Sequence, residues 1–190
     1  MLPLNLPNLL TLLRILMVPV VVVALTTEIE HGLAIAAAVF LAATLTDGLD
    51  GYIARSRQAV TTFGKVMDPI ADKLLIIAAL MALVSLDRVA AWVAMLIIAR
   101  ELAVSGLRIA AGQQGAVIPA SRLGKLKTIA QSLAVLALIA APDVDAVWVQ
   151  VLVWTMLVAT VVSGADYFMS FRRRVDEDVA ERAATADRVA

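Results

Sequence analysis

Residues 33–54 read LAIAAAVFLAATLTDGLDGYIA, and residues 67–86 read MDPIADKLLIIAALMALVSL. Each stretch is about as long as the roughly 20 apolar residues that an α-helix needs to cross the hydrocarbon core of a bilayer. Similar apolar stretches cover about 9–25, 89–111, 126–141 and 147–168. The chain is therefore expected to be an all-α integral membrane protein of six transmembrane helices, preceded by a short interfacial segment over 1–7.

The composition is that of a membrane protein rather than a soluble domain. Of the 190 residues, 62% are hydrophobic and 17% charged, and the mean hydropathy is +0.91, whereas a soluble domain is about half apolar. The 16 basic and 16 acidic residues balance, so there is no general attraction to nucleic acid. The chain has no cysteine and only one histidine, His31. Any bound metal is therefore expected to be a hard cation held by oxygen ligands.

The charges in the expected turns alternate from one side of the membrane to the other. Acidic residues lie in the turns after the first and fifth helices: Glu28, Glu30, Asp143 and Asp145. Basic residues gather after the second, fourth and sixth helices: Arg55, Arg57, Lys65, Arg108, Arg122, Lys125, Lys127 and 172–174. The positive-inside rule makes the basic side cytoplasmic, so both termini are expected there. Residues 1–171 are expected to form one membrane domain, and 172–190 a polar cytoplasmic tail.

Four aspartates interrupt the second and third apolar stretches. Asp47 and Asp50 are three residues apart, and Asp68 and Asp72 are four apart, so each pair shares one face of its helix. An aspartate in mid-membrane costs roughly 2.5–3.5 kcal/mol on insertion scales and marks a functional site by default. If the two helices pack antiparallel with the pairs facing, two divalent cations, Mg²⁺ or Mn²⁺, would neutralise the four charges. Paired cations recur in phosphoryl displacement. A proton or ion pathway in a small transporter would also explain four such carboxylates.

Small residues accompany the first pair. Gly51 and Ala54 follow Asp47 by four and seven positions, so they share its helix face and leave room for a substrate. Arg55 ends this stripe, where it can meet a phosphate. Ordinary packing of small residues between helices is the alternative explanation for Gly51 and Ala54.

The full pattern resembles the signature of the CDP-alcohol phosphotransferase family, without departure. It reads Asp47-x-x-Asp50-Gly51-x-x-Ala54-Arg55, eight residues, then Gly64-x-x-x-Asp68-x-x-x-Asp72. The resemblance implies a homodimer whose site opens to the cytoplasm. It also implies that the four aspartates bind the cations and that catalysis falls to Asp72, as general base, and Asp68. Spacing alone does not choose between Asp72 and Asp68.

The resemblance assigns the CDP-lipid to a second set of residues, namely Gly51, Ala54, Arg55 and Thr61. A polar stripe in the first helix, Asn8, Thr11 and Arg14, is expected to face the site and hold the nucleotide. The alternative is interfacial anchoring with a snorkelling arginine. The segment from Asn5 to Arg14 also resembles the start of the bacterial phosphatidylglycerophosphate synthase branch of the family.

Basic residues of the fourth and fifth helices are candidates for binding the acceptor phosphate: Arg100, Arg108, Lys125 and Lys127. The alternative is that they are positive-inside charges and that Arg100 pairs with Glu101. Their segments resemble the same branch, and the likeness covers most of residues 5–131. It implies transfer from CDP-diacylglycerol to sn-glycerol 3-phosphate in a bacterial cytoplasmic membrane, giving phosphatidylglycerol phosphate and CMP. Inositol phosphate, serine or phosphatidylglycerol remain alternative acceptors.

Overall fold

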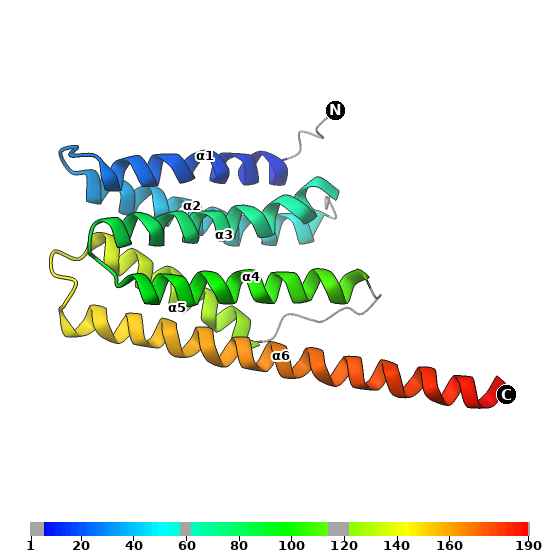
Figure 1. The fold of residues 1–190 in the computed structure, drawn as a ribbon. Coiled ribbons are helices and arrows are strands. Elements are labelled where there is room, and N and C mark those ends of the chain that lie inside the picture. The colour runs from blue at the N-terminus through cyan, green and yellow to red at the C-terminus, as the bar shows by residue number, and fades with distance from the viewer. Residues whose placement is uncertain (1–5, 58–61, 114–121, 190) are drawn as a thin grey trace.

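The computed structural model describes the backbone of residues 6–57, 62–113 and 122–189, and the side chains of 9–46, 67, 70, 71, 73–112 and 123–174. All six elements in these ranges are helices, and no strand occurs in them (Figure 1). They are α1 (Leu6–Thr26), α2 (Gly32–Arg57), α3 (Thr62–Ser85), α4 (Ala91–Gln113), α5 (Arg122–Ala140) and α6 (Val147–Val189). The expected all-α fold is confirmed.

Three of the helices are long and apolar enough to cross a bilayer by length and composition. Within the described residues these spans are Leu9–Thr26, Leu123–Ala140 and Val147–Arg174. Within the described residues, helices α2 and α3 contribute the shorter apolar segments Gly32–Thr46 and Lys73–Ser85. Helix α4 carries Arg100, Glu101 and Arg108 inside its apolar sequence. The count of six spans therefore stays a prediction.

Successive helices run in opposite directions, so the two ends of the bundle differ in charge (Figure 1). One end holds the turns 27–31, 86–90 and 141–146, with Glu28, Glu30, Asp87, Asp143 and Asp145; we call it the acidic end. The start of α1 and the far end of α6 both lie toward the opposite end. This arrangement agrees with the expectation that the two termini share one side.

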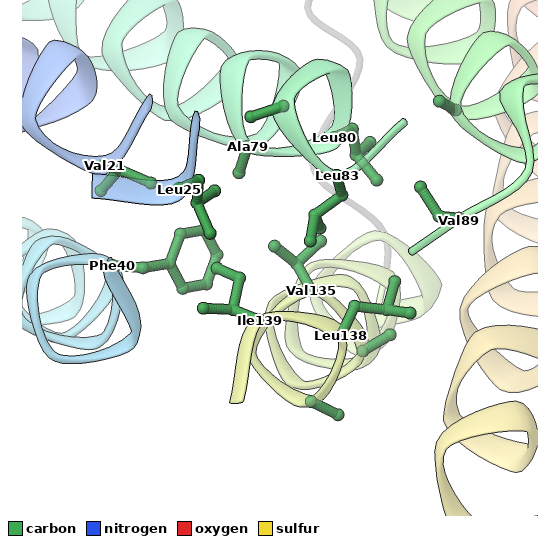
Figure 2. Packing of buried hydrophobic residues seen from close by; sticks show 14 of the residues in the cluster. Val21, Leu25, Phe40, Ala79, Leu80, Leu83, Val89, Val135, Leu138 and Ile139 are labelled. Atoms are coloured by element: carbon green, nitrogen blue, oxygen red, sulfur yellow. The ribbon is translucent and has the colours of Figure 1, made fainter. Parts of the chain in front are cut away.

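Helix α1 packs against α2 and α3, and α5 packs against α2, α3 and α6. Buried apolar side chains fill the space between them (Figure 2). The labelled residues are Val21 and Leu25 of α1, Phe40 of α2, Ala79, Leu80 and Leu83 of α3, Val89 in the following turn, and Val135, Leu138 and Ile139 of α5. Large apolar side chains also cover the outside, as expected where lipid is the solvent; Met95, for example, is 68% exposed.

A tight turn joins α1 to α2. A Cβ on Gly32 would lie 2.5 Å from the carbonyl oxygen of Ala24, so only glycine fits this close approach. His31, just before it, adopts a positive φ of 62°. The turn places the N-terminus of α2 directly against the last turns of α1.

Arg88 and His31 are the only basic residues in the described turns of the acidic end. The Nε of Arg88 donates a hydrogen bond of 2.7 Å to the carbonyl oxygen of Leu138, and its Nη2 donates to that of Ala141. These carbonyls belong to the C-terminal turn of α5 and to the residue after it. Carbonyl groups at the end of a helix have no backbone N–H of the next turn to accept a hydrogen bond from. The charge of Arg88 thus stabilises the end of a helix.

Helix α6 continues far beyond its apolar part. The polar segment predicted as a tail, 172–190, is helical through Val189, and the helix has 43 residues. At 1.5 Å per residue it is about 65 Å long, roughly twice the thickness of a hydrocarbon core. Its C-terminal half extends past the other helices (Figure 1).

Candidate active site

The four aspartates lie on regular helices. Asp47 and Asp50 belong to α2, and Asp68 and Asp72 to α3, with helical backbone throughout both pairs. Their spacings therefore place each pair on one side of its own helix. Helices α2 and α3 run antiparallel and contact each other. The aspartate side chains lie outside the described residues, so their convergence stays a prediction.

The same holds for the CDP-lipid residues of this region. Gly51, Ala54 and Arg55 lie in the last part of α2, on helical backbone, and their side-chain surroundings are outside the described residues. Thr61 is outside them altogether. Counted along the helices, Asp50 and Asp68 each lie about 10 Å from the end of the bundle opposite the acidic end.

Two residues of the polar stripe of α1, Thr11 and Arg14, face the protein interior. Thr11 and Arg14 are each only 1% exposed, whereas Leu12 and Leu16 are 43% and 59% exposed. A snorkelling arginine keeps its guanidinium in water, so the burial of Arg14 excludes that alternative. Both residues have interaction partners in the structure. The side chain of Asn8, the third member of the stripe, lies outside the described residues.

Arg100 and Lys127 meet at a single carboxylate. Lys127 Nζ of α5 donates a hydrogen bond to Glu101 Oε1 of α4, and Arg100 Nη1 lies 3.4 Å from the same oxygen. Arg100 Nη2 also donates a 2.9 Å hydrogen bond to Ser163 Oγ of α6. We call Arg100, Glu101, Lys127 and Ser163 the polar cluster. The predicted convergence of Arg100 and Lys127 is therefore present, and so is the alternative pairing of Arg100 with Glu101.

Helix α6 takes part in this cluster, which sequence reasoning did not foresee. Ser163 Oγ lies within hydrogen-bond distance (3.2 Å) of the carbonyl oxygen of Thr160, one turn earlier. Gly164 packs against the arginine: a Cβ there would lie 3.3 Å from Arg100 Cγ. The sequence signal for this contact was the presence of Thr160, Ser163 and Gly164, two small polar residues and a glycine, inside an apolar span.

The other two acceptor candidates lie apart from the cluster. The guanidinium carbon of Arg108 is 5.7 Å from the centroid of the Tyr167 ring, a cation–π distance. Arg108 and Lys125 are both exposed. No described contact joins either of them to Arg100 or Lys127. Two of the four predicted residues are thus brought together, and two are not.

The cluster adjoins the helix that carries Asp68 and Asp72. Helix α3 contacts both α4 and α5. Lys73, next to Asp72 in the chain, lies close enough to Lys127 for an electrostatic interaction between the two ammonium groups. A phosphate bound by the cluster would therefore be near the aspartate-bearing helix.

These features define a helical membrane protein in which a cluster of buried charges lies between α4, α5 and α6, next to the helix that carries Asp68 and Asp72. The chain belongs to the CDP-alcohol phosphatidyltransferase family, whose sequence model matches residues 4–163. This finding confirms the resemblance seen in the motif, and it makes the chain a member of a family of enzymes.

Relatives from several bacteria support the narrower branch. The chain is 41% identical over 180 residues to the CDP-diacylglycerol–glycerol-3-phosphate 3-phosphatidyltransferase of Bacillus subtilis, covering 86% of this chain and 93% of the relative. It is 38% identical over 175 residues to the protein of that name from Rickettsia felis, covering 89% and 96%. It is 45% identical over 170 residues to a Mycobacterium tuberculosis protein named "Probable phosphatidylglycerophosphate synthase", covering 86% and 79%.

Proposed function

We propose that this protein transfers the phosphatidyl group of CDP-diacylglycerol to sn-glycerol 3-phosphate, giving phosphatidylglycerol phosphate and CMP. The names of relatives at 38–45% identity support the two substrates. The structural observation that carries the acceptor assignment is the meeting of Arg100 and Lys127 beside α3, because a partly buried and a buried cation at one place suit a phosphate-bearing acceptor.

The donor is bound from α1 and α2. The buried Thr11 and Arg14 of α1, together with Asn8, hold the cytidine diphosphate. The stripe Gly51, Ala54 and Arg55 of α2, with Thr61, lines its other side. The apolar exterior lets the acyl chains of the donor stay in the lipid while its head group reaches the site.

The donor set fits two divalent cations of the hard class, Mg²⁺ or Mn²⁺. Asp47, Asp50, Asp68 and Asp72 supply four carboxylates on two contacting helices, and carboxylate oxygens are the ligands that these ions prefer. Bound there, the cations would polarise the phosphorus and stabilise the leaving phosphate of CMP.

The protein's own residues orient and deprotonate the acceptor. Asp72 takes the proton from the attacking hydroxyl of glycerol 3-phosphate. The hydroxyl oxygen bonds to the phosphorus that carries diacylglycerol, and the bond from that phosphorus to the bridging oxygen of the diphosphate breaks. CMP leaves with the bridging oxygen and its electron pair. Arg100 and Lys127 hold the acceptor's phosphate and so position its hydroxyl.

The protein acts as a homodimer in the bacterial cytoplasmic membrane, with both termini and the active site facing the cytoplasm. The concentration of basic residues away from the acidic end supports this orientation. A reporter fused after Ala190 is expected to read as cytoplasmic, and one inserted between Asp143 and Asp145 as periplasmic. A periplasmic signal from the first fusion would contradict the proposed orientation.

An acceptor screen with labelled CDP-diacylglycerol and purified protein tests the reaction. We expect CMP release with glycerol 3-phosphate and little with glycerol, because glycerol lacks the phosphate. Faster turnover with inositol phosphate, serine or phosphatidylglycerol would assign the protein to another branch of the family. Failure to release CMP with every acceptor would refute the proposed reaction.

Arg108 and Lys125 are exposed cations that lie apart from the polar cluster, but they stay candidates for contacting the acceptor's phosphate, and alanine at either position is then expected to weaken acceptor use. A charge-assisted hydrogen bond contributes roughly 1.5–3 kcal/mol, so kcat/KM for glycerol 3-phosphate should fall about ten- to a hundredfold. The KM for CDP-diacylglycerol should stay nearly unchanged. Arg173→Ala, which removes an exposed cation from α6, is the matched control. Equal damage to donor use would instead assign these cations to the diphosphate or to the fold.

A further inference from the structure

We infer that Glu101, which is not among the ligands predicted from the sequence, is the positioning residue of the acceptor-phosphate site. This inference rests on the proposed function. One carboxylate oxygen of Glu101 contacts cations from two helices, Arg100 of α4 and Lys127 of α5. Through them Glu101 sets where the acceptor's phosphate binds, without touching it.

Arg100 is held from three sides. Its Nη1 lies 3.4 Å from Glu101 Oε1, and its Nη2 donates a 2.9 Å hydrogen bond to Ser163 Oγ. The bare Cα of Gly164 lies against the arginine stem, where a Cβ would come within 3.3 Å of Arg100 Cγ. A long flexible side chain is thereby restricted to one arrangement before any ligand arrives, which lowers the entropy lost on binding.

The charges of the cluster do not balance. Glu101 and Lys127 are each 6% exposed, and the side chain of Arg100 is 15% exposed. In the described cluster two cations, Arg100 and Lys127, share one carboxylate. Buried charges are stable only when they are paired. The excess positive charge of the described cluster would be neutralised by an anion.

Unused donors accompany the excess charge. Arg100 Nε and Gln131 Nε2 are buried, and neither has a hydrogen-bond acceptor among the described residues. Gln131 follows Lys127 by one helical turn on α5, and it is 2% exposed. Guanidinium and ammonium groups only donate hydrogen bonds, and phosphate oxygens accept them. The donor excess therefore suits a phosphate group.

Glu101 cannot itself bind such a ligand, because a carboxylate and a phosphate repel each other. Its effect is on the cations. Without its charge, Arg100 and Lys127 repel each other in a buried place, and Lys127 loses its described acceptor. Both side chains are then expected to move away from their present positions. The acceptor's phosphate would then lose its contacts with Arg100 and Lys127.

Glu101→Gln keeps the shape of the side chain and removes its charge. We expect the KM for glycerol 3-phosphate to rise at least about tenfold, as for the loss of a charge-assisted interaction, with the KM for CDP-diacylglycerol within about twofold of the native value. Glu101→Asp restores the charge on a shorter side chain, and it should recover part of the loss. An unchanged KM for glycerol 3-phosphate would overturn the inference. A lowered KM would also overturn it, since Glu101 would then be competing with the phosphate for Lys127.

A second variant approaches Arg100 from α6 without altering any charge. Gly164→Ala places a methyl group against the arginine stem, and it should raise the KM for glycerol 3-phosphate with little effect on that for the donor. The matched control is Gly112→Ala on α4, where an added Cβ meets nothing within 4 Å. This pair decides the question if Glu101→Gln does not fold: equal acceptor KM values in the two glycine variants would overturn the inference. Failure of the native protein to use glycerol 3-phosphate would instead refute the proposed function.

Discussion

Replacing Asp72 with asparagine is expected to lower kcat by at least about 10²-fold, the loss typical of removing a general base. Asparagine keeps an oxygen that can bind a cation but cannot take up the proton of the acceptor hydroxyl. CDP-diacylglycerol should therefore still bind. CMP release measures the first effect, and equilibrium binding of the donor measures the second.

The same chemical change at the acidic end is the control for this variant. Asp145→Asn alters an exposed carboxylate between α5 and α6, at the opposite end of the bundle from the proposed substrate entrance. It should leave turnover near the native rate. Near-native turnover of Asp72→Asn would contradict the assignment and make Asp68, one turn earlier on α3, the next candidate for the base.

Removal of divalent cations is expected to abolish activity altogether. Without them, four carboxylates on two contacting helices repel each other and take up protons, and nothing compensates the negative charge of the diphosphate. Excess chelator should therefore stop CMP release, and added Mg²⁺ or Mn²⁺ should restore it. Anomalous scattering from crystals grown with Mn²⁺ should show two ions in each chain.

Two observations would contradict two-metal catalysis. One is full activity in excess chelator, and the other is a single ion per chain in a crystal of active protein. The double variant Asp47→Asn, Asp50→Asn provides an internal check, because loss of both carboxylates of α2 should lower metal binding along with activity. Retained binding of two ions in this variant would place the metals elsewhere.

The helices could be predicted from the sequence because apolar stretches of membrane-spanning length are a strong signal. The fourth expected stretch, about 89–111, corresponds to α4 at Ala91–Gln113. Most ends of the other expected stretches likewise lie within a few residues of the ends of their helices. The end of α6 was not predicted. Its last part is polar, so it gives no membrane-span signal. Helix-forming residues and opposite charges four positions apart, such as Arg173 and Glu177, are a weaker indication of a helix.

The site was only partly predictable, because periodicity reports on one helix at a time. It identified Thr11 and Arg14 as one polar stripe, and the structure buries both. It could not show that Glu101 binds Lys127, 26 positions later, or that Arg100 reaches Ser163, 63 positions later. Such contacts depend on how α4, α5 and α6 pack, and apolar patterns do not encode that packing.

Helix α1 is synthesised before α2 and α3, so it carries Arg14 into the membrane before the two helices that pack against it exist. An arginine at the centre of an isolated helix costs roughly 2.5–3.5 kcal/mol on translocon insertion scales. The apolar remainder of α1 outweighs this cost, but it does not remove the drive of the guanidinium toward the head groups. The nascent helix is therefore expected to sit shallow or tilted at first. We expect it to reach its final depth only after α2 and α3 have been made, which would couple insertion and folding of this chain.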